Sequence, residues 1–423
     1  MISQMELIGN DKVGILSGPF DVHQLAKDIA SNKDLQKNDS SFMVVSIDKI
    51  IERFQLWKKQ LPMIEPFYAV KCNTDPVLVR ILATLGCGFD CASREEIDIV
   101  MNTGVSADRL IYANPCKTRS FIAHAMQCDV RMMTFDNAEE LVKISKLHPN
   151  AEMILRIAVS DPTATCPLNL KFGCDPVLVA PQLLKKAYDE GVNVVGISFH
   201  VGSGCNDATA YRTALQHAKN LCEIGEGFGF EMNIIDMGGG FPGSAHHNSF
   251  ENIAKVIRDA IDEFFPDTEK RLIAEPGRFF AASPFSLVAN VIHATEVPAS
   301  KITKDEKDGG DSGYMYYIND GVYGSFNCIL FDHCHPVGGP LFDQESDQKF
   351  MSTIWGPTCD SLDLVEDKKL MPRLQVGDWM YYPDMGAYTI AASTTFNGFA
   401  KPTMIYMMTE ELWNEKIKDS KNI

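Results

Sequence analysis

The sequence has little of what marks several classes of protein. Its 39 Lys and Arg residues face 56 Asp and Glu residues, a formal net charge of −17, and no stretch gathers enough basic residues to attract a phosphodiester backbone. No run reaches the roughly 18 apolar residues of a membrane span. The start of the chain has no basic segment followed by an apolar run and a small-residue cleavage site. We therefore expect a cytoplasmic protein that binds neither nucleic acid nor membranes.

The sequence also contains no CxxC pair, although it has 12 cysteines. The cysteines are scattered along a long chain without a secretory signal, so we expect reduced and mostly buried thiols rather than a disulfide framework. The run His333, Cys334 and His335 has metal-binding residue types, but it lacks a second group of ligands at a familiar spacing. No metal site is predicted from the sequence.

The overall composition is typical of a folded globular protein, for which an enzyme is the default expectation. Apolar residues make up 45% of the 423 residues and charged residues 22%, which is the usual balance of a globular protein. A chain of this length exceeds what one hydrophobic core usually supports. We therefore expect two domains, or one large barrel with an appendage.

Short β-like runs alternate with longer amphipathic stretches through the first two thirds of the chain, a pattern that indicates βα units and a parallel sheet. Eight β-like runs are present, at residues 67–71, 88–92, 110–114, 130–135, 153–158, 194–200, 233–238 and 271–275. Eight βα units predict an α/β fold with a (β/α)8 TIM barrel, placed at residues 47–283. Catalytic residues of that fold lie at the C-terminal ends of the strands.

After residue 284 the pattern changes to alternating β-branched and aromatic runs separated by turn residues. We predict an all-β domain made of residues 284–423 and 1–46, with a strand at 42–47 joining it from the N-terminal segment. The insert at 301–313 is rich in charge and glycine, so we expect an exposed, mobile loop there.

Several predicted strand ends carry residues that suit a pyridoxal-phosphate site. A lysine at the mouth of a barrel, such as Lys71, can lose its proton and form a Schiff base with an aldehyde cofactor. The pyridine nitrogen of the cofactor needs a carboxylate, for which Glu275 is the candidate. The glycines of MGGGFPG can approach the phosphate closely, and Arg278 can add charge. His200 could hold the ring face, with Ser203 bonding the phosphate. Each residue alone also has an ordinary structural explanation, so their joint occurrence carries the prediction.

Eight motifs resemble those of eukaryotic ornithine decarboxylases and follow that family's order. They are PFYAVKCN (66–73), GFDCAS (88–93), FHVGSG (199–204), DMGGGFPG (236–243), AEPGR (274–278), NDGVYGSFN (319–327), WGPTCDSLD (355–363) and DMGAYT (384–389). The resemblance implies a pyridoxal-phosphate barrel and a β-domain, assembled as a head-to-tail homodimer with two shared active sites. It also implies decarboxylation of L-ornithine to putrescine, the first step of polyamine biosynthesis.

The resemblance assigns roles to single residues of the cofactor site. Lys71 looks like the Schiff-base lysine, Glu275 like the partner of the pyridine nitrogen, and His200 like the residue stacked on the ring. Asp90, Glu96 and Arg156 resemble the polar network that surrounds this lysine in the family. The phosphate ligands that the resemblance implies are Ser203, Gly240, Gly277, Arg278 and Tyr388. Gly238 and Gly239, from the same glycine run, are further candidates for cofactor binding.

The β-domain is implied to supply residues for the substrate. Cys359 resembles the proton donor to the substrate carbon, and a thiol is a plausible acid for that step. Asp332 and Asp360 resemble the pair that binds the distal ammonium of ornithine. The substrate-binding set is completed by Tyr323, Phe331 and Phe396.

Two details concern the expected dimer and the substrate pocket. Cys359 and Asp360 are expected to enter the site of the partner chain, and Lys171 and Asp363 could pair across the same interface. Phe331 stands where a tyrosine is common in the family, so a hydroxyl near the substrate is absent.

Two alternatives stay open at this point. A non-catalytic, antizyme-inhibitor-like regulator would keep the fold but lose cofactor and proton-donor residues, whereas Lys71 and Cys359 are present here. A decarboxylase of lysine, arginine or diaminopimelate would share the barrel and much of the cofactor site. The segment at 114–136 resembles the region where animal members bind antizyme, which makes antizyme a candidate partner.

Overall fold

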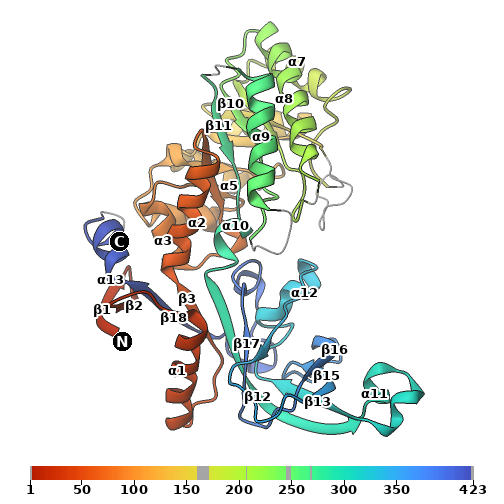
Figure 1. Cartoon of the computed structure of the whole chain (residues 1–423). Helices are drawn as coiled ribbons and strands as arrows, with labels where there is room; N and C mark the ends of the chain where they lie inside the picture. Colours follow the sequence, from red (N-terminus) through yellow and green to blue (C-terminus); the bar gives the residue numbers. More distant parts are fainter. Residues whose placement is uncertain (1, 160–170, 206, 244–248, 267–268, 421–423) are drawn as a thin grey trace. The chain divides into compact units, whose positions relative to one another are not determined.

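The computed structural model describes residues 2–159, 171–205, 207–243, 249–266 and 269–420 (Figure 1). The chain divides into two compact units. One unit comprises Met1–Ile50 and Ala281–Asp419, and the other comprises Ile51–Phe280 and Ser420–Ile423. We call them the sheet unit and the barrel unit and describe each by itself.

Eight parallel strands close into a barrel in the order β10-β11-β4-β5-β6-β7-β8-β9. The strands are β4 (Ile64–Ala69), β5 (Gly88–Cys91), β6 (Leu110–Tyr112), β7 (Met132–Phe135), β8 (Glu152–Ile157), β9 (Val194–Phe199), β10 (Ile234–Asp236) and β11 (Arg271–Ala274). The predicted TIM barrel is therefore confirmed, and seven of the eight strands end slightly earlier than the sequence pattern indicated, while β7 ends at Phe135 as predicted. Apolar side chains from the strands, among them Phe67, Ile154 and Ile273, pack as one cluster of buried residues.

Helices follow the barrel strands and bury one apolar face each. They are α2 (Ile47–Gln60), α3 (Pro76–Thr84), α4 (Arg94–Met101), α5 (Arg119–Gln127), α6 (Ala138–Leu147), α7 (Ala180–Asp189), α8 (Thr209–Gly227), α9 (Phe250–Phe264) and α10 (Arg278–Ala281), with 3₁₀ turns η1 (Val70–Cys72) and η2 (Ala107–Arg109). The sequence of α9 illustrates why these segments form helices. Ser249 caps the N-terminus, and apolar residues at helical spacing, from Phe250 to Phe264, form the buried face.

The sheet unit is built on a ten-stranded sheet with the main order β1-β2-β18-β3-β12-β13-β15-β16. Its strands are β1 (Ile2–Ile8), β2 (Asp11–Leu16), β3 (Phe42–Ser46), β12 (Phe285–Pro298), β13 (Ser312–Ile318), β14 (Gly339–Pro340), β15 (Lys349–Trp355), β16 (Leu364–Pro372), β17 (Trp379–Tyr382) and β18 (Thr403–Thr409). β3 pairs with β12 and with β18, so the predicted strand at 42–47 does join this sheet.

The sheet unit also contains helices, which the prediction of an all-β domain did not include. They are α1 (Val22–Leu35), α11 (Ser300–Thr303), α12 (Cys328–Phe331) and α13 (Glu410–Leu412), with short turns η3 (Glu306–Gly310), η4 (Ser325–Asn327), η5 (Ile390–Ala392), η6 (Phe396–Gly398) and the π-turn η7 (Trp413–Ile417). The insert at 301–313 was predicted as a loop, but it contains α11 and η3. Two local features explain the difference. The buried Ile302 holds α11 against the unit, and the Asp305 side chain caps η3 by accepting a hydrogen bond from the Lys307 amide.

Eleven cysteines in the described part of the chain have free thiols, and most of them are buried. This agrees with the expectation of reduced, buried thiols. Within the described residues, no helix has both the length and the apolar character that crossing a membrane requires.

Candidate active site

Lys71 and Asp90 form an ion pair at the C-terminal ends of two neighbouring barrel strands. β4 ends at Ala69, so Lys71 lies in turn η1 and not in the strand as predicted. Ala69 pairs with Asp90 across β4 and β5, and this register brings the Asp90 carboxylate to the Lys71 ammonium. Asp90 is fully buried, whereas the Lys71 side chain is 43% exposed. The carboxylate therefore fixes a lysine that remains accessible.

Glu96 extends this network from helix α4. Its carboxylate accepts a hydrogen bond of 2.6 Å from the Ala92 amide, and Ser93 caps the helix. Burial raises the pKa of Glu96 and Asp90 raises it further, while the hydrogen bond from Ala92 and the charge of Lys71 act in the opposite direction. The end of β5 and the start of α4 thus surround Lys71 with two carboxyl groups.

Glu275 and Asp236 are two buried carboxyl groups that interact with each other. Asp236 accepts hydrogen bonds from the Ser198 hydroxyl at 2.7 Å and from the Gly238 amide at 3.0 Å. Burial raises the pKa of Asp236 to about 6, and burial together with the charge of Asp236 raises the pKa of Glu275 well above its usual range. No role for Asp236 was predicted from the sequence. Its position at the end of a short apolar strand, where barrel enzymes place their active-site residues, could have indicated one.

One oxygen of Glu275, Oε1, is buried and has no hydrogen-bond partner among the residues that the structure describes. A buried carboxylate oxygen without a donor is costly. The protonated ring nitrogen of a pyridine cofactor is a donor of the required kind. The residues present therefore fit pyridoxal phosphate at this position.

His200 follows β9 and presents a neutral imidazole. Its Nδ1 accepts a hydrogen bond of 3.0 Å from the Gly202 amide. Burial, and then the positive charges of Arg156 and Lys71, hold the pKa of His200 well below its usual range. A Cβ atom on Gly239 would lie 2.7 Å from His200 Nε2, so only glycine leaves room for the ring. The imidazole thus lies against the glycine loop.

The glycine loop at 238–240 follows β10 and is held by a tyrosine. The Tyr211 hydroxyl donates a 2.8 Å hydrogen bond to the Gly239 carbonyl. Gly240 has a φ of +112°, which favours glycine, and a Cβ there would lie 2.8 Å from the Tyr211 oxygen. Arg278 donates to the Ser203 hydroxyl at 3.5 Å and directly follows Gly277. Together these groups offer amides, a hydroxyl and a cation to an anionic ligand.

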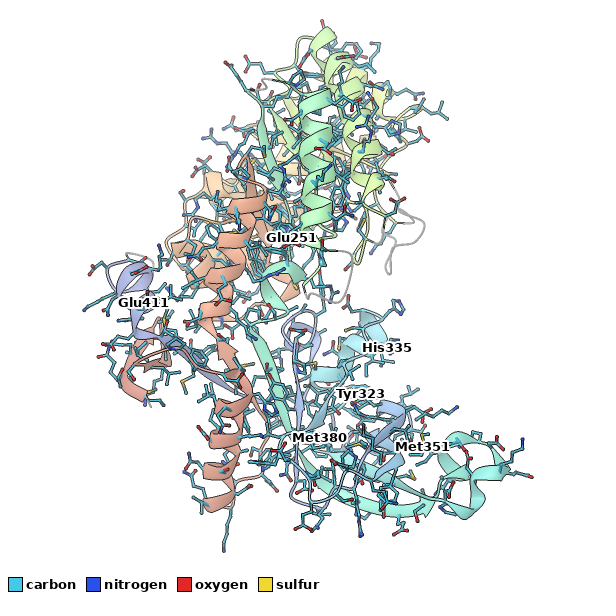
Figure 2. All side chains as sticks on the ribbon, in the orientation of Figure 1. Glu251, Tyr323, His335, Met351, Met380 and Glu411 are labelled. Atoms are coloured by element: carbon cyan, nitrogen blue, oxygen red, sulfur yellow. The ribbon has the colours of Figure 1, made fainter. Side chains whose placement is uncertain are left out.

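The predicted substrate residues belong to the sheet unit. The Tyr323 hydroxyl, labelled in Figure 2, donates a hydrogen bond to the Asp360 carboxylate. This bond holds the pKa of Asp360 below its usual range and raises the pKa of Tyr323. The Tyr323 and Phe396 rings lie 4.4 Å apart, and both line a small cavity of ≈ 20 Å³. Cys359, beside Asp360, is exposed.

The other predicted site residues of the sheet unit differ in how exposed they are. Asp332 is buried and directly follows α12, whereas Phe331 is 69% exposed. Tyr388 is half-buried and has a φ of 56°, an unusual backbone conformation for an aromatic residue.

Asp363 is buried within the sheet unit and holds two loops together. It accepts hydrogen bonds from the Val322 amide at 2.8 Å and from the Thr358 amide and hydroxyl at 2.9 and 2.6 Å. The expected pairing of Asp363 with Lys171 of a partner chain stays a prediction. Both oxygens of Asp363 are used to join the two motifs that contain Tyr323 and Cys359.

The comparisons with known proteins agree with this arrangement. Residues 47–282 match a family model described as the pyridoxal binding domain of pyridoxal-dependent decarboxylases. The chain is 78% identical to an ornithine decarboxylase of Caenorhabditis elegans, over the full length of both chains. It is 45% identical to antizyme inhibitor 2 of Xenopus laevis, over 93% of this chain and 87% of that protein.

The structural comparison adds a relative with another substrate. The crystal structure of the arginine decarboxylase of Paramecium bursaria Chlorella virus, bound to agmatine, matches with a TM-score of 0.84 and 35% sequence identity. The match covers 91% of this chain and 100% of the viral chain.

Proposed function

The chain belongs to the family of pyridoxal-dependent decarboxylases, and from that premise we propose that it decarboxylates L-ornithine to putrescine, the first step of polyamine biosynthesis. Pyridoxal 5′-phosphate is the cofactor. The proposal rests on the grouping of Lys71, Asp90, Asp236 and Glu275 at the strand ends of the barrel. It is supported by the 78% sequence identity to an ornithine decarboxylase.

Each group of the barrel site has a defined task in this proposal. Lys71 holds the cofactor covalently, and Asp90 holds a proton at the lysine Nζ. Glu275 would accept a hydrogen bond from the protonated ring nitrogen, and Asp236 would hold Glu275 in position through their shared side-chain hydrogen bond. His200 covers the ring face. When bound, pyridoxal phosphate supplies the electron sink for the carbanion that remains after loss of carbon dioxide.

The phosphate is proposed to bind the amides and the cation of the glycine loop region. Gly239, Gly240 and Gly277 allow close approach of backbone N–H groups, while the Gly238 amide shapes the loop by donating to Asp236. The proposed set is completed by Ser203, Arg278 and Tyr388, and Arg156 belongs to the polar network around Lys71.

The sheet-unit residues are proposed to act on the substrate. Cys359 donates a proton to the α-carbon, after which product can leave. Asp332 and Asp360 bind the distal ammonium, and the hydrogen bond from Tyr323 keeps Asp360 ionised for this purpose. A substrate with an apolar side chain would leave both carboxylates unpaired, which explains selection for a diamino acid. Phe331 and Phe396 supply apolar contacts.

A homodimer with shared sites completes this proposal. The division proposed is a barrel domain at 47–283 and a β-domain at 1–46 and 284–423 that contributes Cys359 and Asp360 to the partner's site. Exposed apolar side chains of the sheet unit support it: Phe331, Leu362 and Phe396 are 69%, 61% and 48% exposed. Leu362 lies two residues after Asp360, and the Phe396 ring contacts Tyr323.

The decisive experiment is an assay of carbon dioxide release from ornithine, lysine and arginine with added pyridoxal phosphate. We expect ornithine to be used best, with putrescine as product. A preference for arginine would move the assignment to the activity named for the viral relative, and a preference for lysine would make the protein a lysine decarboxylase. No release from any of the three would favour a non-catalytic regulator.

The relationship to antizyme inhibitor 2 does not favour that last alternative. The residues proposed to bind the cofactor and donate the proton, including Lys71, Asp90, Arg278 and Cys359, are all present. Retention of the whole reacting set is what an enzyme requires.

We also propose antizyme as a protein partner, bound near the segment at 114–136. Helices α5, α6 and α7 border a groove of ≈ 450 Å³ lined by Arg119, Lys143, Lys146 and Lys186 together with one acidic residue, Glu139. Such a basic groove on a chain of net charge −17 favours an acidic surface as partner. A pull-down with antizyme should recover the protein, and should fail for Lys143→Glu with Lys146→Glu but not for Lys185→Glu on the same unit.

A cytoplasmic location is the remaining part of the proposal. The free thiols of eleven described cysteines suit a reducing compartment. Fractionation of cells that express the protein tests this point, and enrichment in a membrane or secreted fraction would contradict it.

A further inference from the structure

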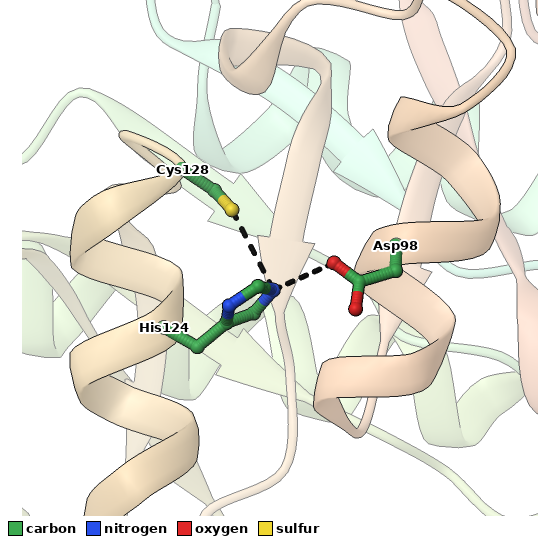
Figure 3. Close-up of side chains that lie close together, drawn as sticks. All are labelled: Asp98, His124 and Cys128. Carbon is green, nitrogen blue, oxygen red and sulfur yellow. Dashed lines mark hydrogen bonds and ion pairs between the residues drawn. The ribbon is translucent and has the colours of Figure 1, made fainter.

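Asp98, His124 and Cys128 form a cluster of three metal-binding side chains between helices α4 and α5 (Figure 3). Asp98 lies on α4, His124 lies on α5, and Cys128 is the residue that caps the C-terminus of α5. One ligand atom of each residue lies within 4.8 Å of the other two. None of the three belongs to the residues proposed above for cofactor or substrate.

Both neighbours of His124 approach the same ring nitrogen. Nε2 lies 2.7 Å from Asp98 Oδ1 and 3.6 Å from Cys128 Sγ. A ring nitrogen that carries a proton can donate it to the carboxylate, and the sulfur is only a weak acceptor of the same proton. Hydrogen bonding therefore serves the carboxylate well and the thiol poorly. A cation between the three atoms would satisfy all of them.

The spacing of the nitrogen and sulfur atoms suits zinc. Bond lengths of about 2.05 Å to nitrogen and about 2.3 Å to sulfur, at a tetrahedral angle, place these atoms about 3.6 Å apart. The observed separation of His124 Nε2 and Cys128 Sγ is 3.6 Å. The Asp98 oxygen is closer to Nε2, at 2.7 Å, than the roughly 3.3 Å of a zinc site and would have to move outward. Its side chain is 37% exposed and has room to do so.

We propose that Asp98, His124 and Cys128 bind one zinc ion that joins α4 to α5, with water as the fourth ligand. A thiolate, an imidazole and a carboxylate are the ligand types that zinc takes in proteins, and this mixture is poorly suited to magnesium or calcium. Arg94 supports the site, because its Nε lies 3.6 Å from Asp98 Oδ2 and leaves Oδ1 for the metal.

Binding of zinc displaces a proton from the thiol. Only the thiolate form of Cys128 can bind the metal, so a thiol proton passes to the buffer when the Zn–S bond forms. The heat of zinc binding should accordingly depend on the ionisation enthalpy of the buffer.

The test titrates the metal-stripped holoenzyme, with its pyridoxal phosphate kept, with zinc and separately with cobalt(II). We expect one equivalent of metal per chain, a cobalt–thiolate charge-transfer band, and a rise in Tm on adding zinc. Cys128→Ser should abolish the band, and Asp98→Asn should weaken zinc binding at least about tenfold, as loss of a metal-ligand contact typically does. Both changes are conservative, so folding of each variant can be checked by its circular dichroism.

Matched cysteine variants separate this site from adventitious binding. Cys116→Ser and Cys334→Ser alter two other accessible thiols and should leave the stoichiometry, the band and the Tm shift unchanged. The proposal is overturned if Cys128→Ser retains the band, if the Cys116 or Cys334 variant loses it, or if no stoichiometric metal binds.

Discussion

The two groups of proposed active-site residues differ in how they are held. At the strand ends of the barrel, Asp90, Asp236 and Glu275 are buried carboxyl groups, and burial raises the pKa values of Asp236 and Glu275. In the sheet unit, Cys359 is exposed and Asp360 is half-buried, with a pKa lowered by its bond from Tyr323. A buried carboxyl group is tolerated only with suitable partners, and the partner that we propose for Glu275 of the barrel group is the bound cofactor. The sheet group is a set of loops facing solvent.

The loops of the sheet unit are shaped by two buried acids beneath them. Asp320 accepts hydrogen bonds from the Ser325 hydroxyl at 2.6 Å and from the Gly321 and Ser325 amides at 2.8 Å each. Asp363 joins the next motif in the same way. Asp320 and Asp363 thus anchor loops of the sheet unit, whereas Asp90 and Glu275 of the barrel are proposed to bind the lysine and the cofactor. The following experiments test this difference.

Loss of the barrel lysine should have the largest effect. Lys71→Ala removes the proposed covalent attachment and the ion-pair partner of Asp90, so we expect decarboxylation to fall by at least about a thousandfold, near the upper range for loss of a reacting acid–base group. Borohydride reduction should attach cofactor to the Lys71 peptide of the wild type and to no peptide of the variant. The exposed Lys185→Ala variant serves as control and should behave as wild type. Labelling of another lysine would refute the assignment.

Mixing two inactive variants tests whether the two groups come from different chains. If Lys71→Ala and Cys359→Ala are each nearly inactive, subunit exchange gives mixed dimers with one intact site out of two. Random exchange makes half of the dimers mixed, so about a quarter of wild-type activity should return. No recovery, with exchange demonstrated by differently tagged chains, would place both groups in one chain's site.

Glu275→Gln should reduce catalysis more than cofactor binding. The amide cannot hold the ring nitrogen in its protonated form, so we expect activity to fall on the order of a hundredfold. Bound cofactor, measured after release by acid, should change much less. Glu269→Gln, on the same unit, is a suitable control. Unchanged activity of Glu275→Gln would mean that the ring nitrogen has another partner.

Asp320 should make the stability of the protein depend on pH. Burial raises the pKa of its carboxyl group to about 6, above the value in an unfolded chain. The folded form then binds more protons than the unfolded form between about pH 4 and pH 6, so this residue's contribution falls as pH rises through that window. We expect a change of about 2 kcal/mol. Urea unfolding of wild type and Asp320→Asn from pH 4 to 7 measures it, and identical pH slopes would contradict it.

Tyr323→Phe should have the smallest effect. It removes the hydroxyl that donates to Asp360 but keeps the ring against Phe396. The loss of one hydrogen bond to a charged group predicts roughly a tenfold increase in KM for ornithine. The value of kcat should change little, because Tyr323 positions Asp360 and contacts no reacting atom in this proposal. A selective loss of kcat would show that it does.

The sequence alone determined much of this structure, because its strongest signals are local. The alternation of apolar runs and amphipathic stretches predicted all eight barrel strands, since each βα unit must bury one face of its strand and helix. Long motifs identified Lys71, Glu275 and Cys359 as candidate reacting residues. Their roles stay predictions that the experiments above address.

The tertiary structure decided how distant residues meet. The coupling of Asp236 to Glu275 depends on the parallel pairing of β10 with β11, and the use of Asp363 as an anchor depends on its burial under the loop at 319–327. The helical spacing of His124 and Cys128 is visible in the sequence, but Asp98 lies 26 residues before His124. Only the packing of α4 beside α5 brings the third ligand to that nitrogen, because no local periodicity specifies which faces of two helices touch.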